Sequence, residues 1–162
     1  MTTAMQKKTK PDNPSKVQDA IALLRADHKL VSTLFAEYEK TRSNSKKKAL
    51  VSQICMELNV HTQVEEEIFY PAVKQALKDK EMIPEGLVEH ATLKELIRQV
   101  EGIEPDGEMF DAKIKVLSEY VKHHVKEEHN EMFPQAKSTN LDMIELGGKI
   151  VARKKTLLIE RA

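Results

Sequence analysis

The chain has 162 residues, of which 40% are hydrophobic and 32% are charged, with five glycines and six prolines. This length suits one domain with a buried core, and the composition favours helices that have an apolar face and a solvated back. Lysine plus arginine and aspartate plus glutamate both total 26, so the formal net charge is zero. That balance argues against nucleic acid as a partner, because a polyanion needs a basic face.

The sequence also limits the compartment in which the protein is expected. Its one cysteine, Cys55, cannot form an internal disulfide, and we expect a packed thiol in a reducing compartment. No apolar run approaches membrane-spanning length, and residues 1–16 lack the apolar stretch of a signal peptide. These features predict a cytoplasmic protein with no membrane partner. Residues 1–14 are expected to be a disordered arm, after which Ser15 would cap the first helix.

Four segments carry apolar residues at the three- and four-residue spacing of a helix. Polar turns separate the first from the second at 41–45 and the third from the fourth at 102–107. The expected core-facing stripes are Ile21, Leu24, His28, Val31, Phe35 and Tyr38; Leu50, Ile54, Leu58, His61, Glu65 and Phe69; Leu87, His90, Leu93, Ile97 and Val100; and Phe110, Ile114, Leu117, Val121, His124, Glu128 and Met132.

Proline and the tail define the remaining organisation. Pro71 is expected to kink or end the second helix, because proline lacks an amide donor and clashes with the preceding turn. Residues 72–83 are expected to form a connector, with a short helical piece through Leu77, to a third helix that opens at Pro84. No segment alternates as a strand does, so we predict an all-α fold. It would be an up-down-up-down four-helix bundle over residues 15–136, with an additional C-terminal helix over residues 137–162 packed on its outside.

An internal repeat places histidine and glutamate together on two of these helices. In each copy a glutamate follows a histidine by four residues, about one helical turn, so the two side chains share a face. A proline follows each histidine by ten residues. The 62-residue spacing of the other two histidines nearly equals the 63-residue spacing of this pair. The copies are His61, Glu65 and Pro71, and His124, Glu128 and Pro134, with His28 and His90 as the other pair.

The turns place these residues at one height. Residues equidistant from the turn of an antiparallel hairpin face each other. The midpoint of His28 and His61 falls in the turn at 43–45, and the midpoint of His90 and His124 falls at Gly107. Short loops make successive helices antiparallel neighbours, so four histidines and two glutamates should converge inside the bundle.

A single histidine on an apolar stripe is usually a satisfied core residue, and His-x-x-x-Glu is common on exposed helix faces. The combination is different, because two unpaired buried carboxylates would cost several kcal/mol each, as is typical. The stripes offer no lysine or arginine at that level to neutralise them. Bound divalent transition metal ions would resolve the charge. The predicted metal ligands are His28, His61, Glu65, His90, His124 and Glu128.

Several nearby residues are left with two interpretations. His123 lies beside the stripe that contains His124, so it is expected at the boundary of the core, as is His129; either would serve to orient a ligand. Glu66 and Glu127 are expected on the surface or in the same orienting role. Hydrogen bonding or ligation by a tyrosine is considered for Tyr38 and Tyr120, with ordinary packing favoured for both.

These motifs resemble the hemerythrin-like (HHE cation-binding) family over about residues 17–136. The resemblance implies a non-haem diiron centre, with two irons per chain joined by an oxo or hydroxo bridge. It implies that the four histidines are terminal ligands and that Glu65 and Glu128 bridge the irons. Oxygen-carrying hemerythrins have a histidine where this chain has Lys94 and an aspartate where it has His129, so the resemblance does not extend to reversible oxygen transport.

Four histidines, two bridging carboxylates and an oxygen bridge would leave about two of roughly twelve coordination positions open, which is typical of a reactive site. We therefore expect a protein that binds or reduces a small oxidant (O2, peroxide or NO). The alternatives are an iron or redox sensor whose fold depends on metal occupancy, and a helical interaction module that carries zinc. Ferritin-like and zincin chemistry are disfavoured, since the chain has neither Glu-x-x-His nor His-Glu-x-x-His.

Overall fold

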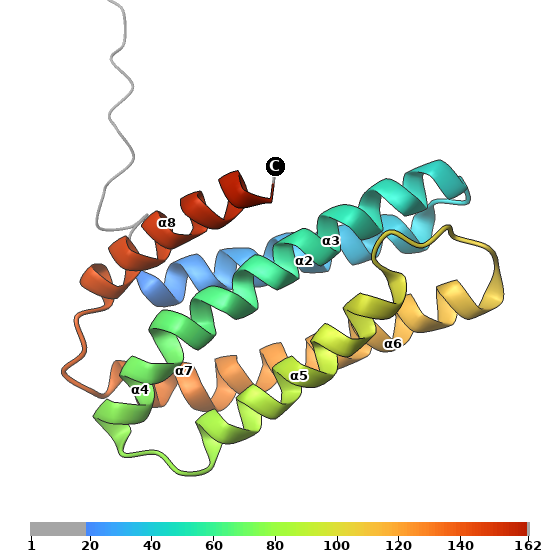
Figure 1. Ribbon diagram of the computed structural model, residues 1–162. Coiled ribbons are helices and arrows are strands. Elements are labelled where there is room, and N and C mark those ends of the chain that lie inside the picture. The colour runs from blue at the N-terminus through green and yellow to red at the C-terminus, as the bar shows by residue number, and fades with distance from the viewer. Residues whose placement is uncertain (1–18, 162) are drawn as a thin grey trace, which may run out of the picture.

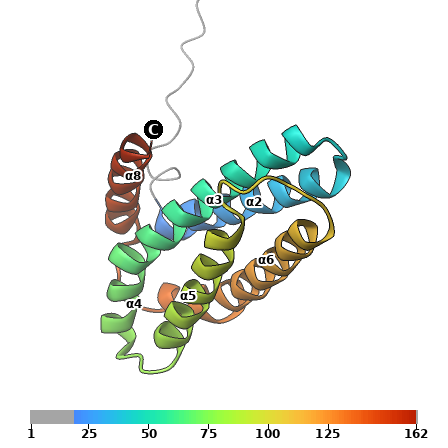
Figure 2. The same ribbon diagram turned by 45° about the vertical axis from the view of Figure 1, so that its right-hand side comes forward.

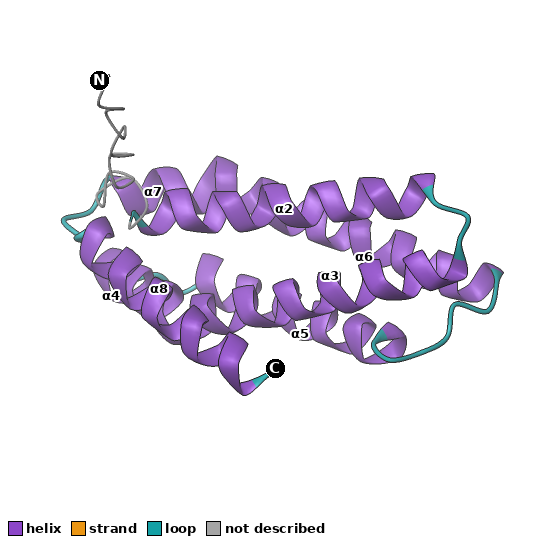
Figure 3. Cartoon of the chain, turned by 90° about the horizontal axis from the view of Figure 1, so that it is seen from above, coloured by secondary structure: helices purple, strands orange, loops and turns teal. Residues whose placement is uncertain are grey.

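The computed structural model describes residues 19–161, and every regular element in that range is helical (Figure 3). The all-α prediction is therefore confirmed. The predicted arm and Ser15 lie outside the described residues. The elements are α2 (Ala20–Lys40), α3 (Asn44–Val64), the π-helical turn η1 (Glu65–Phe69), α4 (Tyr70–Leu77), α5 (Met82–Val100), α6 (Glu108–Glu127), the π-helical turn η2 (Glu128–Met132), α7 (Phe133–Lys137) and α8 (Met143–Glu160).

The helices form the predicted up-down-up-down bundle (Figure 1). Helices α2 and α3 form one antiparallel hairpin and α5 and α6 form a second. The hairpins meet along α3 and α5 and along α2 and α6. Helix α8 lies outside the bundle against α2 and α3, and it continues unbroken through Gly147 and Gly148 (Figure 2). None of the described helices is long and apolar enough to cross a lipid bilayer.

Acidic and hydroxyl side chains fix where the helices begin. Asp19 accepts a hydrogen bond from the amide of Ala22 at the start of α2, and Ser43 caps α3 in the same way. Asp79 accepts from two amides in the first turn of α5, and Asp142 accepts from two in α8. Such caps satisfy amides that have no partner within the helix, and each typically contributes about 1 kcal/mol.

The core consists of two apolar clusters with a polar layer between them. One cluster contains Leu24, Val64 and Phe133, and the other contains Leu58 and Leu117. Nine polar residues are buried in the described part of the chain, and six of them are the predicted metal ligands. The apolar clusters therefore enclose a layer of histidine and glutamate.

One stripe prediction needs correction. Leu87 is 40% exposed, whereas Leu50 is half-buried and packs against the core. The buried face of α5 follows the predicted stripe from His90 to Val100, but one turn earlier it contains Gly86 and Ile83 in place of Leu87. The register includes a glycine because a tyrosine ring packs directly against Gly86, so a leucine is not needed to fill the core there.

Pro71 does not end the second helix, and that part of the prediction is corrected. The irregularity lies before the proline, in η1, where the amide of Tyr70 bonds the carbonyl of Glu65 five residues back. The helix then continues as α4, with Pro71 in its first turn. The wider turn accommodates the proline ring, which would otherwise collide with a carbonyl of the preceding turn. The second copy repeats this arrangement, since the amide of Phe133 bonds the carbonyl of Glu128.

Candidate metal centre

The two hairpins bring their histidines to one level, as the turn positions predict. The Nε2 atoms of His28 and His61 are 3.1 Å apart. The Nε2 atoms of His90 and His124 are also 3.1 Å apart. All four rings are at most 8% exposed. We refer to His28 and His61 as the His28 half of the centre, and to His90 and His124 as the His90 half.

The two glutamates lie between these halves and touch both. Glu65 Oε1 is 2.9 Å from His61 Nε2 and 3.3 Å from His90 Nε2. Glu128 Oε1 is 2.6 Å from His124 Nε2, while its Oε2 is 3.4 Å from His28 Nε2. Each carboxylate therefore contacts histidines of both hairpins.

Three carboxylate oxygens in this layer lack a hydrogen-bond donor within the described residues. They are both oxygens of Glu65 and Oε2 of Glu128. Glu65 is fully buried, and His61 Nε2 approaches it closely without the alignment of a hydrogen bond. Buried carboxylates without donors are costly and call for a compensating charge. Their oxygens and the histidine Nε2 atoms together form the donor set that a divalent transition metal prefers.

The donor atoms divide into groups close enough to hold separate ions. Within each group the ligand atoms lie within 4.8 Å of one another, and every member of the first two groups is buried. A third group is partly exposed and lies at the surface. The groups are Glu65, His90, His124 and Glu128; His28, His61 and Glu128; and Glu89, His123 and Glu127.

Without metal, charge pairing within the layer shifts its pKa values strongly. Burial acts to lower the pKa of His61, but the charge of Glu65 and the hydrogen bond to Asp27 outweigh it and raise that pKa to about 10. Burial likewise opposes protonation of His124, yet Glu128 and Glu65 raise its pKa to about 12. Burial favours a neutral Glu65, but the neighbouring histidines hold its pKa well below the usual range. Protons on His61 and His124 therefore balance the charge of the ionised Glu65 in the metal-free layer, and metal ions would displace those protons.

Each histidine is held by a partner at its outer nitrogen, Nδ1, which leaves Nε2 facing the centre. Three of these partners are carboxylates and the fourth is an imidazole. Such partners fix the tautomer and the ring orientation of a metal ligand. The Nδ1 contacts are His61 to Asp27 at 2.9 Å, His124 to Glu89 at 3.2 Å, His90 to Glu66 at 3.2 Å, and His28 to His129 at 2.9 Å.

Lysines hold two of the outer carboxylates from further out. Lys94 bonds both oxygens of Glu66 at 2.7 and 2.8 Å, and Lys154 of α8 bonds Asp27. Lys94 occupies the position where oxygen-carrying hemerythrins are expected to have a further histidine. In this chain Lys94 does not direct a nitrogen at the centre. It bonds Glu66, which in turn contacts Nδ1 of His90.

Tyr70 is the residue that sequence reasoning missed. It is 1% exposed, and its hydroxyl donates to Glu128 Oε1 at 2.8 Å. The hydroxyl oxygen of Tyr70 also lies 3.2 Å from His90 Nε2 and 3.1 Å from His124 Nε2. Its ring stacks on His90, with centroids 5.1 Å apart, and packs against Gly86, where an added Cβ would lie 3.2 Å from the hydroxyl. Tyr70 therefore lies inside the polar layer, on the His90 side.

Helical periodicity alone could not find this tyrosine. Tyr70 follows Glu65 by five residues, which in a regular helix turns a side chain about 140° away. The π turn η1 inserts one extra residue, so Tyr70 returns to the face of Glu65. The available signal was Pro71, which favours such a turn.

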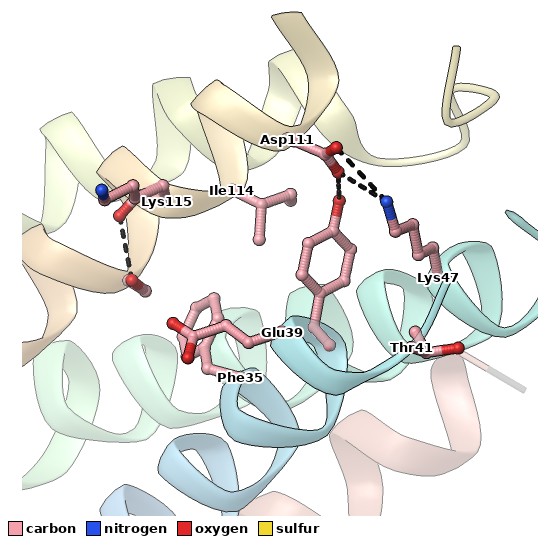
Figure 4. A pocket seen from close by; sticks show the side chains of 9 residues that line it. Phe35, Glu39, Thr41, Lys47, Asp111, Ile114 and Lys115 are labelled. Carbon is pink, nitrogen blue, oxygen red and sulfur yellow. Dashed lines mark hydrogen bonds and ion pairs between the residues drawn. The ribbon is translucent and has the colours of Figure 1, made fainter. Parts of the chain in front are cut away.

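The tyrosines considered from sequence lie elsewhere. Tyr120 is 45% exposed. Tyr38 donates to Asp111, which also accepts from Lys47, beside a cavity of about 240 Å³ (Figure 4). Tyr38 follows His28 by ten residues on one helix, so this cavity is about 15 Å from the polar layer along the bundle. Neither residue contacts the predicted ligands.

The remaining boundary residues take distinct places. His123 is exposed and pairs with Glu127 at 3.1 Å. His129 and Glu66 contact predicted ligands directly, so both have the orienting position. Cys55 is fully buried, and burial raises its pKa to about 12, as expected for a packed thiol.

Comparison with known proteins places this centre in a family. A family model described as the hemerythrin HHE cation binding domain matches residues 19–136. The chain belongs to this family. A crystal structure of a hemerythrin HHE cation-binding domain-containing protein, the Rv2633c homologue of Mycobacterium kansasii, superimposes with a TM-score of 0.72 at 22% identity over 86% of each chain. That likeness concerns the fold.

A relative with an assigned activity is a DNA nickase of Nostoc sp. (strain PCC 7120), which is 30% identical over 117 residues. The match covers 72% of this chain and 32% of the nickase, so the chain spans about a third of that relative's length. What the two proteins share is therefore limited to one part of the larger protein. In this chain, HHE family membership and the buried histidine–glutamate cluster together indicate a metal-binding centre.

Proposed function

We propose that this chain is a hemerythrin-like non-haem diiron protein that binds or reduces a small oxidant, namely O2, peroxide or NO. Two ions would lie in the polar layer, one in each half, bridged by Glu65 and Glu128. The observation that carries the proposal is the set of three buried carboxylate oxygens that have no donor among residues 19–161 and face four histidine Nε2 atoms. The four histidines and two glutamates fit iron in number and donor type.

Iron held in this way would supply electrons to a small oxidant at its open coordination positions. The protein's own groups do the rest. The partners at Nδ1 keep each histidine lone pair directed inward, and Tyr70 offers a hydroxyl proton within the layer. The apolar clusters on both sides keep bulk water from the centre.

The space beside the centre favours a very small substrate. A cavity of about 10 Å³ adjoins His28, His61 and His124 and is walled by apolar side chains that include Val31 and Leu93. This volume accepts one water-sized molecule. An organic substrate would not fit without displacement of the core. The balanced net charge also supports a small-molecule substrate over DNA.

Elemental analysis of anaerobically purified protein tests the proposal first. The expected result is two irons per chain. The reduced protein should then change its visible absorption when O2, peroxide or NO is added in stoichiometric amounts. One zinc per chain, or no metal, would show that the six residues form only a polar network within a structural bundle.

A second candidate function is an iron or redox sensor, and one chain of contacts favours it. Lys154 of α8 bonds Asp27, and Asp27 bonds His61 of the centre. Metal occupancy is thereby connected to the outermost helix. A sensor would show no catalytic turnover when O2 is titrated against the reduced protein, and would lose helicity when iron is stripped. Turnover with retained helicity would favour the oxidant-handling function.

A further inference from the structure

The two halves of the centre are related by the sequence repeat but are not equivalent. The acidic residues before His28 and His90 have matching roles. Asp27 contacts Nδ1 of His61, and Glu89 contacts Nδ1 of His124. Two other repeat-related positions differ in kind. Glu66 corresponds to His129, because each follows a bridging glutamate directly, and Tyr70 corresponds to Phe133, because each precedes the proline.

In the His90 half, both histidines have a carboxylate at Nδ1. His90 contacts Glu66 at 3.2 Å and His124 contacts Glu89 at 3.2 Å. A carboxylate at Nδ1 raises the basicity of the imidazole and strengthens its bond to a cation. This half also receives the hydroxyl of Tyr70 and contributes to a four-residue group of buried donors.

In the His28 half, one of these carboxylates is replaced by an imidazole. His28 Nδ1 lies 2.9 Å from Nε2 of His129, whose ring fixes the orientation of His28 but brings no carboxylate. Phe133 stacks on His28, with centroids 6.0 Å apart and planes 12° apart, and offers no donor atom. The group of buried donors here has three members, and one of them, Glu128, is shared with the other half.

We propose that the two halves fill in order. The His90 half takes the first divalent cation, and the His28 half takes the second about 10- to 100-fold more weakly, which is the effect typical of changing one outer partner of a metal ligand. This inference rests on the proposed two-ion centre. It assigns to His129 a positioning role that sets the affinity of the second ion, and it makes that ion the exchangeable one.

A cobalt titration of the full-length metal-free protein tests the order. Co²⁺ is added against a competing chelator, and binding is followed by visible absorption. Two steps separated by about 10- to 100-fold in affinity are expected. His129→Glu supplies the missing carboxylate and should tighten the second step toward the first. The mirror change, Glu66→His, should weaken the first step toward the second.

Asn130→Asp is the matched control for His129→Glu. It adds one negative charge at the neighbouring exposed position, outside the contact with His28. It should leave both steps within about twofold of the unaltered protein, since exposed charges are well screened. Equal movement of the second step in Asn130→Asp and His129→Glu would mean that general charge, rather than the Nδ1 contact, sets the affinity, and would overturn the role of His129.

The outcomes separate this inference from the function on which it rests. Fewer than two Co²⁺ per chain would overturn the two-ion centre itself. Two Co²⁺ bound in one step of equal affinity would leave the centre intact and overturn the order. The third outcome is two binding steps whose affinities change in neither His129→Glu nor Glu66→His, while circular dichroism shows that both variants keep their helical content. This outcome would overturn the roles of His129 and Glu66 in setting the order of binding.

Discussion

The two hairpins carry the same ligands but exchange their surroundings. The α2–α3 hairpin continues into η1 and α4, and this continuation supplies Glu66 and Tyr70 to the histidines of the other hairpin. The α5–α6 hairpin continues into η2 and α7, which return His129 and Phe133 to His28. Each half of the centre is therefore built by one hairpin and completed by the extension of the other.

The comparison shows that two different features position the predicted ligands and the residues around them. Helical spacing repeats the histidines and glutamates, because the ligands need only share a face and a height. The π turns then determine which later residues reach the centre, and here the copies differ. Substitutions at shared positions should affect both halves, whereas substitutions at the exchanged positions should affect one.

The largest effect is expected at the shared glutamates. Glu65→Ala removes a carboxylate that touches both His61 and His90, so the chain should lose at least one of its two ions. Elemental analysis after anaerobic reconstitution measures this loss. Glu67→Ala is the matched control, because Glu67 is exposed and pairs with Arg153 on the outside. An unchanged metal content in Glu65→Ala would show that Glu65 does not bridge the halves.

The level of the centre could be predicted from sequence because it depends on regular features. His28 and His61 are equidistant from one turn, and the corresponding pair is equidistant from Gly107, so antiparallel packing determines their height. The structure keeps that geometry. Leu87 was misplaced because Gly86 and Leu87 both lie about one turn before His90, and only the packing of Tyr70 against Gly86 selects between them.

A second test concerns pH and the metal-free protein. The pKa values of His61 and His124 are raised to about 10 and about 12, from about 6.5 in an unfolded chain. A raised folded-state pKa contributes stability that is fully present below pH 6.5 or so and is lost as the pH rises through the folded value. The free energy of unfolding should therefore fall from about pH 6.5 upward, by at most about 1.4 kcal/mol per pH unit for each histidine.

Metal loading should reverse this trend, because the ligand nitrogens must be deprotonated to bind. Urea unfolding of metal-free and loaded protein between about pH 6 and pH 9 measures both slopes, and the gap between the two curves should widen with pH. Parallel curves would mean that metal does not replace protons in the layer. Of the two halves, the one that contains His61 should lose its proton first, since its pKa is the lower.

Exchange of one hydroxyl sharpens the comparison further. Tyr70→Phe gives the His90 half the ring that the His28 half already has. It removes the hydroxyl donor to Glu128 Oε1 and leaves that buried oxygen with only its contact to His124. The free energy of unfolding of the metal-free protein should fall by about 1–3 kcal/mol. Tyr120→Phe, at an exposed position, should change it by less than about 0.5 kcal/mol. Equal losses of unfolding free energy in Tyr70→Phe and Tyr120→Phe would mean that the Tyr70 hydroxyl does not stabilise the polar layer.

For His129 and Glu66 the sequence left the orienting role as one of two interpretations and could not name the histidine that each contacts, for a related cause. His129 and Glu66 follow Glu128 and Glu65 by one residue, and in an isolated helix that position points about 100° from the stripe that contains those glutamates. Their reach to His28 and His90 depends on the helix packed beside them, which no periodicity within one segment reveals. Lys154 is more remote still, since α8 is separated from Asp27 by most of the chain.

The smallest effect is expected at this last contact, which exists in one half only. Lys154→Met keeps most of the side chain but removes the charge that holds Asp27, so His61 is oriented less firmly while the His90 half is untouched. Because the lysine is partly exposed, the stability cost should be about 1 kcal/mol or less. The second metal-binding step should weaken by a few-fold and the first should stay fixed. Lys155→Met, one residue along at an exposed position, is the control. A change in the affinity of the first metal-binding step would show that α8 influences both halves of the centre. The contact of Lys154 would then not be specific to the His28 half.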